Sequence, residues 1–184
     1  LVNKELGGGS ILDIGCYPMS ISRPLVGAVN GSNFMNPLSI EGKGELNTQE
    51  IDLNASANLT FEDGSKAQIR SATNLSSESK VEITDGKTTV VIDQPWHCGE
   101  FTERKSQIKF KKANGDEELI DITTDKGLYA LEIDHFSETF KDQNIESDLI
   151  PHNDSHGNMI ALDTWRKELK VIYDEDRGEK RQLP

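Results

Sequence analysis

The sequence is poor in cysteine, in long apolar runs and in positive charge. Two cysteines, Cys16 and Cys98, stand among 184 residues, which suits a reducing compartment in which neither needs a partner. No run of about 18 apolar residues occurs, and this excludes a membrane-spanning helix. A net charge of −12 argues against a nucleic-acid or anionic-membrane surface, because either would favour clustered basic residues. We therefore expect a cytoplasmic protein that binds a small molecule or another protein.

The chain also lacks an initiator methionine and a leader. It begins at Leu1, and no charged and then apolar segment with a cleavage signal follows, so we expect that an upstream part is absent. Five Asn-x-Ser/Thr triplets would suit a secreted, glycosylated carbohydrate-binding module. They begin at Asn30, Asn54, Asn58, Asn74 and Asn153. Such triplets arise readily in a chain rich in Asn and Ser, and without a leader we favour the cytoplasm.

Residues 10–26 have the pattern of a helix. Ser10 would cap its start and Gly27 would stop it. Pro18 lies inside this segment, where it removes one backbone donor and frees the carbonyl of Ile14. The sequence therefore predicts a helix with a kink beside Tyr17.

This helix carries the catalytic candidates. Asp13 and Tyr17 are four residues apart, a spacing that places both side chains on one helical face. A phenol beside a carboxylate can exchange a proton with a substrate hydroxyl or carbonyl. Two structural interpretations stay open: Asp13 could complete a capping box with Ser10, and Tyr17 could be a core aromatic whose hydroxyl binds the backbone.

From Lys43 onward the apolar residues recur with a period of two. Between Ile51 and Phe61 they alternate with Asp, Asn, Ser and Thr, which predicts a long strand with one buried face. Asp63-Gly64, Asp85-Gly86 and Asn114-Gly115 are hairpin signals. We expect one uninterrupted, open and mainly antiparallel sheet. Its semi-polar face would be solvated or would meet a second copy across a two-fold axis, and we favour the homo-oligomer.

Helical periodicity returns after Gly127. One apolar stripe ends near Asp142, and a second helix follows a short loop, with Asp154 or Ser155 as its cap. Residues 174–184 form a charged tail. Helices from both ends of the chain would cover one face of the sheet, so residues 1–184 form a single α+β domain.

Two further clusters could be functional. Trp96 and His97 interrupt the strands, and they would suit either the wall of a polyol or carbonyl pocket or a packed turn. His152, Asp154 and His156 lie close together, but His152 precedes the predicted helix, so no regular ligand spacing is assured. We expect cap and loop groups there, and no metal site.

Three segments resemble one known family. Residues 7–18, GGGSILDIGCYP, followed by Arg23 and Gly27, closely resemble the segment that follows the dinucleotide-binding half in the glucose-fructose oxidoreductase, inositol dehydrogenase and MocA family. The motif Y-x-x-E-x-x-H-F at 129–136 and the segment 148–163 resemble the closing helices of that family. The resemblance spans nearly the whole chain and is strongest at its two ends.

The resemblance implies a C-terminal substrate domain: an open, mainly antiparallel sheet that carries part of the active site and, in many members, the dimer contact. It implies that Tyr17 is the general acid/base, that Asp13 orients or polarises the proton-transfer group, and that both work with a lysine of the preceding domain. Many sugar dehydrogenases of the family have histidine where Tyr17 stands. Tyrosine looks more like the glucose-fructose oxidoreductase, xylose dehydrogenase and dihydrodiol dehydrogenase branches.

The family's dinucleotide half is missing. No G-x-G-x-x-G occurs, because Leu12 stands at the position that would complete the pattern of Gly7 and Gly9. The cofactor, NAD or NADP, would be bound mainly by the absent N-terminal domain, and this fragment alone should be inactive. The full-length protein would transfer hydride between the nicotinamide and a sugar, polyol or related carbonyl substrate. The alternative is a non-catalytic domain whose sheet mediates association.

Overall fold

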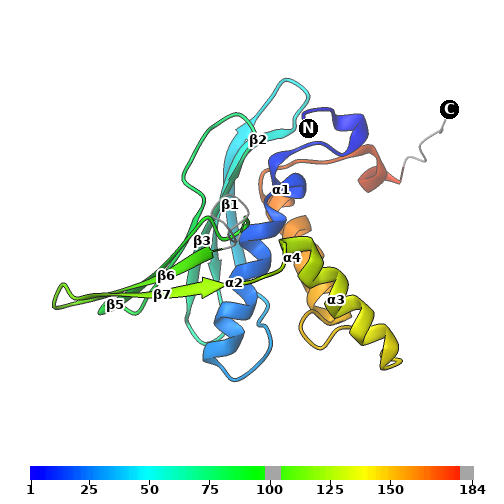
Figure 1. Ribbon diagram of the computed structural model, residues 1–184. Coiled ribbons are helices and arrows are strands. Elements are labelled where there is room, and N and C mark those ends of the chain that lie inside the picture. Colours follow the sequence, from blue (N-terminus) through cyan, green and yellow to red (C-terminus); the bar gives the residue numbers. More distant parts are fainter. Residues whose placement is uncertain (98–104, 179–184) are drawn as a thin grey trace. The chain divides into compact units, whose positions relative to one another are not determined.

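The structure is a computed structural model that describes residues 1–97 and 105–178. Cys98 and residues 179–184 of the charged tail lie outside these ranges. The chain forms two compact units, one of Leu1–Ser76 with Asp148–Pro184 and the other of Ser77–Ser147 (Figure 1).

The first unit combines helices with a three-stranded antiparallel sheet of order β1-β2-β3. Its elements in chain order are a 3₁₀ helix Lys4–Leu6, α1 Ser10–Asp13, α2 Cys16–Val29, β1 Ser39–Leu46, β2 Asp52–Thr60, β3 Lys66–Ala72, α4 His152–Glu168 and a 3₁₀ helix Asp174–Arg177. Residues from the two ends of the chain thus complete one unit.

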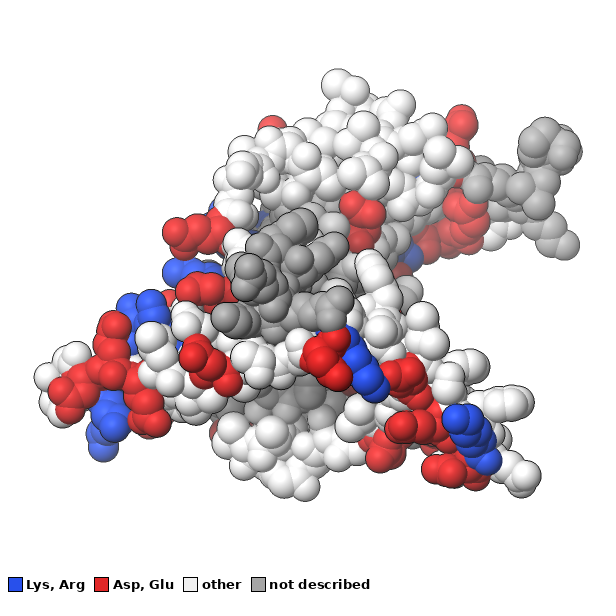
Figure 2. Space-filling model, in the orientation of Figure 1, with Lys and Arg blue, Asp and Glu red and all other residues white. Residues whose placement is uncertain are grey.

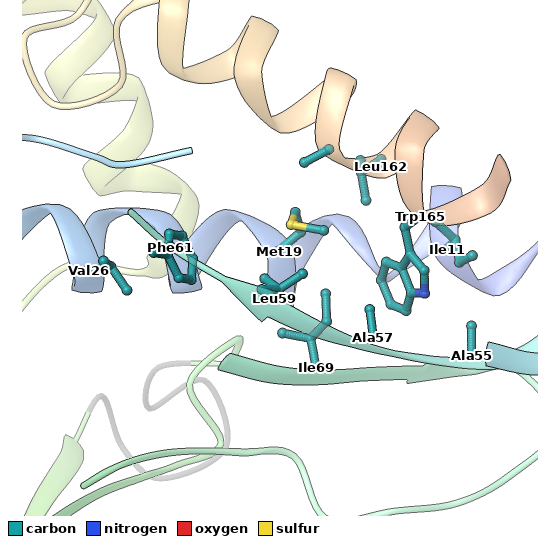
Figure 3. Packing of buried hydrophobic residues seen from close by; sticks show 11 residues of the cluster. Ile11, Met19, Val26, Ala55, Ala57, Leu59, Phe61, Ile69, Leu162 and Trp165 are labelled. Carbon is teal, nitrogen blue, oxygen red and sulfur yellow. The ribbon is translucent and has the colours of Figure 1, made fainter. Parts of the chain in front are cut away.

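One apolar core joins α1, α2 and α4 to a single face of this sheet (Figure 3). Trp165 of α4 is completely buried, and its indole N–H donates to the backbone oxygen of Ser56 at 3.2 Å. The buried apolar residues of this core are Ile11, Met19, Val26, Ala55, Ala57, Leu59, Phe61, Ile69, Ala161, Leu162 and Trp165. The alternation predicted for the strand that ends near Phe61 is confirmed, because every second residue of β2 from Ala55 onward is buried.

The opposite face of the same sheet is polar. Strand pairing aligns Ser56 with Lys43 on one side and Arg70 on the other. Amide side chains bridge the strands on this face: Asn54 donates to a Glu45 carboxylate oxygen at 2.8 Å, and Gln68 to the Asn58 side chain at 3.3 Å. The face therefore presents interleaved amides and charges.

The second unit is a four-stranded antiparallel sheet of order β4-β5-β6-β7 followed by one helix. Its elements are β4 Lys80–Thr84, β5 Thr88–Asp93, β6 Lys105–Lys112, β7 Glu117–Thr123 and α3 Leu128–Lys141. Ion pairs link opposite charges within it, such as Lys126 with Asp134 at 2.6 Å. On the face shown in Figure 2, Lys and Arg side chains lie among Asp and Glu and gather in no basic patch of described residues.

The α+β class, the antiparallel meander and the three hairpins are confirmed. Gly64, Gly86 and Gly115 have φ of +85°, +84° and +88°, the left-handed conformation that glycine adopts without steric cost. The single uninterrupted sheet is wrong, because the strands of the described ranges form two sheets. The sequence between Ala72 and Lys80, TNLSSES, explains the division, since Ser, Thr and Asn compete for the backbone hydrogen bonds of a strand.

Two predicted helix ends are also wrong. α2 continues through Gly27 to Val29, and a Cβ on Gly27 would lie 2.4 Å from the Cα of Phe34. Glycine stands there because another part of the backbone approaches closely. α4 begins at His152 directly after Pro151 without a side-chain cap, so Asp154 and Ser155 lie inside its first turn. α3 has the predicted bounds to within one residue.

Candidate active site

The helix predicted over residues 10–26 is interrupted at Ile14 and Gly15, where α1 ends and α2 has not begun. Pro18 accounts for the interruption, because in a continuous helix its ring would meet the carbonyl of Ile14. The break places Pro18 in the first turn of α2, where a missing N–H leaves nothing unpaired. The Ile14 oxygen accepts from the Tyr17 N–H at 3.2 Å instead. The predicted kink is thus a full break.

Asp13 and Tyr17 lie on either side of this break. Asp13 is the last residue of α1 and Tyr17 the second residue of α2. Both side chains are exposed, and Tyr17 keeps 51% of its accessible surface. The phenol is therefore not enclosed in the apolar core. Because the spacing argument assumed a continuous helix, the pairing of these two side chains stays a prediction.

The start of α1 is anchored by Asp52, the first residue of β2. The Asp52 Oδ2 accepts from the Ile11 N–H at 2.7 Å and from the Ser10 hydroxyl at 2.8 Å. Ser10 also lies 3.0 Å from the Ser71 hydroxyl of β3. The predicted Ser10 cap is wrong, since Ser10 is itself helical and Gly9 holds the cap position. The carboxylate that accepts the hydrogen bond from the Ile11 N–H at the start of α1 belongs instead to Asp52 of β2.

Asp52 is almost completely buried, at 1% exposure. Burial raises the pKa of its carboxyl, and the hydrogen bonds from Ile11 and Ser10 oppose the shift. Nearby Tyr173 donates its hydroxyl to the Gly8 oxygen at 2.7 Å, and burial, reinforced by the charge of Asp52, raises the pKa of Tyr173 to about 12. The alternation in the sequence predicted that Asp52 lies on the solvent-exposed face of its strand. No local pattern in the sequence pairs Asp52 with Ser10, which is 42 positions away.

Arg23 anchors α2 and is completely buried. Its Nε and Nη2 donate to the Asn36 side-chain oxygen at 3.1 and 2.8 Å, and its Nη1 lies 2.8 Å from an Asp154 carboxylate oxygen. The guanidinium also stacks over the Phe34 ring at 5.0 Å. Burial lowers the pKa of Arg23 and the Asp154 charge opposes this. The helix that carries Tyr17 is thereby joined to α4.

Cys16, between the two catalytic candidates, behaves as a packing residue. It is partly buried against the core, and its thiol lies 3.6 Å from the Asp13 backbone oxygen. Burial raises the pKa of the Cys16 thiol. Its thiolate is therefore disfavoured, and a nucleophilic role is not indicated.

Trp96 and His97 lie in a turn after β5, in the second unit. Trp96 is partly buried and His97 is exposed, and the His97 N–H donates to the Gln94 oxygen at 3.2 Å. Both belong to a different unit from Asp13 and Tyr17, so their role in substrate binding stays a prediction.

His152 is the first residue of α4, so the prediction that it precedes this helix is wrong, and it lies four positions before His156. His152 and His156 are exposed, whereas Asp154 is buried against Arg23. In residues 1–97 and 105–178 no three His, Cys, Asp or Glu side chains are grouped so that they could hold a metal ion. A search of the same ranges finds no helix long and apolar enough to span a membrane.

Comparison with known proteins shows what this arrangement is similar to. No protein-family model matches the chain. Over 174 residues the chain is 24% identical to the scyllo-inositol 2-dehydrogenase (NADP(+)) IolU of Bacillus subtilis, a match that covers 95% of the chain and 48% of IolU. The chain thus spans about half the length of this curated relative.

Solved structures share the fold at low sequence identity. The aldose-aldose oxidoreductase from Caulobacter crescentus, complexed with glycerol, matches with a TM-score of 0.73 and 18% identity over 92% of this chain and 48% of its own. A mutant of the 3-ketoreductase KijD10 from Actinomadura kijaniata, in complex with TDP-benzene and NADP, matches with a TM-score of 0.67 and 19% identity over 89% of this chain and 48% of its own. The UDP-N-acetylglucosamine 3-dehydrogenase GnnA from Acidithiobacillus ferrooxidans matches with a TM-score of 0.64 and 15% identity over 90% of this chain and 50% of its own.

Proposed function

The chain has the C-terminal-domain fold of the glucose-fructose oxidoreductase, inositol dehydrogenase and MocA family, and from this premise we propose that it is the substrate domain of an NAD(P)-dependent oxidoreductase. The names of the similar proteins support a sugar, a polyol or a related carbonyl compound as the substrate class. Because the chain contains no G-x-G-x-x-G, the dinucleotide would be bound mainly by a preceding domain, and the fragment alone would be inactive.

The chain's own residues would bind the substrate and handle its proton. When bound, the nicotinamide supplies the hydride chemistry. The Tyr17 phenol would exchange a proton with the substrate oxygen that changes between hydroxyl and carbonyl. Asp13 would orient or polarise this group, and a lysine of the preceding domain would help to bring the pKa of the phenol toward working pH.

One observation carries this proposal: the Tyr17 phenol is exposed at the start of α2, and the same helix is anchored by the completely buried Arg23, which pairs with Asp154. A proton-transfer group needs access to substrate together with a rigid support. Tyr17 has both.

The test is Tyr17→Phe in the complete protein that contains this chain. We expect turnover to fall by about two to four orders of magnitude, the range of a positioned acid/base group. Tyr129→Phe is the matched control, because Tyr129 is also an exposed helical tyrosine and the proposal gives it no part in proton transfer. Unchanged turnover in Tyr17→Phe would remove Tyr17 from the mechanism.

A second candidate function, association of two copies through the β1-β2-β3 sheet, is favoured by the polar outer face. Amide side chains there can donate and accept, and Lys43 lies two strands from Arg70 with Ser56 between them. A self-complementary face of this kind suits an isologous contact. Dimerisation without turnover in the complete protein would favour association as the sole function.

A further inference from the structure

The helix that carries Asp13 is too short to support itself. α1 has four residues, and isolated helices of a single turn are unstable because nucleation costs more than one hydrogen bond returns. The Asp13 N–H donates to the Gly9 oxygen at 3.2 Å, and the Ile14 and Gly15 amides donate to the Ser10 oxygen at 3.1 and 2.8 Å. The position of Asp13 therefore depends on whatever fixes Gly9 and Ser10.

Asp52 fixes them. Its Oδ2 binds both the Ile11 amide and the Ser10 hydroxyl, and bonds to a charged acceptor are about twice as strong as neutral ones. Gly9 packs directly on the same carboxylate, since a Cβ there would lie 2.4 Å from Oδ1. With φ of +139°, Gly9 occupies a conformation that other residues rarely adopt.

The charge of Asp52 is costly for the fold. Its Oδ1 is buried and has no hydrogen-bond partner in the described part of the chain, and a buried carboxylate that is incompletely paired destabilises the folded state. A neutral side chain of similar size would avoid this cost. Stability alone therefore does not favour aspartate here.

We propose that Asp52 is a positioning residue, which holds the single turn of α1 so that Asp13 stands in a fixed place beside the start of α2. The proposal rests on the proposed function and extends it. Asp52 acts through Ser10, Ile11 and Gly9, and its burial keeps it from contacting a substrate directly. Its carboxylate is the link between the sheet and the predicted catalytic pair.

The test compares single and double variants of the complete protein. Asp52→Ala should lower kcat at least about tenfold while KM stays within about twofold, because a displaced group costs rate more than binding. Asp52→Asn should restore most of kcat, since its amide oxygen can still accept from Ile11. Combined with Asp13→Asn, the Asp52→Ala change should lower kcat by less than about threefold, because coupled residues are not additive.

Ile69→Ala is the matched control. Ile69 lies in the same core, but the hydrogen bonds that hold the start of α1 come from Asp52 and Ser71, so the variant loses stability while these bonds stay, and its kcat should equal that of the unaltered protein. Hydrogen exchange at the Asp13 amide should rise in Asp52→Ala and stay unchanged in Ile69→Ala. If Asp52→Ala fails to fold, Ser10→Ala removes one of the same bonds and should show a smaller loss of kcat with the same dependence on Asp13.

Two results would overturn different statements. Equal losses of kcat from Asp52→Ala with and without Asp13→Asn would overturn the positioning role while the oxidoreductase proposal stands. No turnover of any sugar, polyol or carbonyl substrate by the unaltered complete protein would overturn the proposed function, and the positioning role with it.

Discussion

The guanidinium of Arg23 in α2 lies 2.8 Å from the carboxylate of Asp154 in α4, and both residues are buried. Gly157, one turn further along α4, leaves the space that this pair needs, since a Cβ there would lie 2.5 Å from Arg23 Nη2. The helix with Tyr17 and the last long helix of the chain are therefore joined through the guanidinium of Arg23, whose side chain is completely buried.

Arg23→Met should destabilise the first unit by about 3–5 kcal/mol, because it leaves Asp154 buried and unpaired. Arg23→Lys should also destabilise it, since an ammonium group cannot reproduce the planar fork that meets Asn36 and Asp154 together. Denaturant unfolding measures both changes. Arg177→Met, at an exposed arginine, should stay within about 0.5 kcal/mol. A similar small effect in Arg23→Met would contradict the structural role of the pair.

Gly42→Ala should cost about 1–3 kcal/mol through overpacking. A Cβ at Gly42 would lie 2.8 Å from a Leu169 methyl group and 2.9 Å from the Trp165 ring. Gly127→Ala is the control, because nothing lies within 4 Å of a Cβ there. The free energy of unfolding of the two variants decides whether α4 packs on β1 as closely as described. Equal stability of the two variants would contradict this packing.

Asp176 should make the first unit sensitive to acid. Hydrogen bonds from Arg166, in a fork of 2.6 and 2.7 Å, lower the pKa of Asp176 from 3.8 to about 2. Because the folded-state pKa lies below the unfolded one, the stabilisation is complete above about pH 4 and is lost as the pH falls toward about 2. Asp176→Asn should flatten the fall in stability over this window. An unchanged pH profile in the variant would show that the fork adds nothing to stability.

Asp52 should have the opposite effect of pH on stability. Burial raises the pKa of Asp52 above 3.8, so its carboxyl takes up a proton more readily in the folded than in the unfolded state, and the stability gained by this at low pH is lost as the pH rises through the folded pKa. The difference in unfolding free energy between Asp52→Asn and the unaltered chain should therefore shift in favour of the variant as the pH rises above about 4. Asp63→Asn is the control with the reverse sign, because hydrogen bonds from Asn30 and Ser65 lower the pKa of Asp63. Equal pH profiles for the two variants would contradict the burial of the Asp52 charge.

Ser56→Lys should prevent association through the outer face of β1-β2-β3. The new charge would stand between Lys43 and Arg70, and three positive charges in a row would repel a second copy placed across a two-fold axis. Light scattering of the complete protein measures the oligomeric state. Ala28→Lys adds the same charge at an exposed position of α2 and should leave association unchanged. An intact dimer in Ser56→Lys would exclude this face as the contact.

Local patterns predicted the elements whose cause is local. The three Asx-Gly turns and α3 follow from neighbouring residues alone, and each was found where the sequence placed it. β1 was not recognised as a separate strand, because Gly42 and Gly44 supply no apolar side chain to complete the alternation. They are glycines because Leu169 and Trp165 pack against them, and that contact joins distant parts of the chain.

The candidate site shows the same limit. Asp13 and Tyr17 were found by their spacing and by resemblance, and the structure adds only that both are exposed on separate helices. The anchors could not be predicted, because Asp52 binds Ser10 across 42 positions and Arg23 meets the Asp154 backbone oxygen across 131. Such contacts depend on the folded topology and leave no periodic trace in the sequence.

The first unit is interrupted in sequence by the whole of the second. Leu162 and Trp165, which close its core against β2, emerge from the ribosome only after residues 77–147 have done so. The second unit consists of neighbouring hairpins with short loop closures, and such local topologies form rapidly. During translation the sheet β4-β5-β6-β7 should therefore become ordered before the first unit does. The apolar faces of α1, α2 and β1-β2-β3 would stay exposed until α4 emerges.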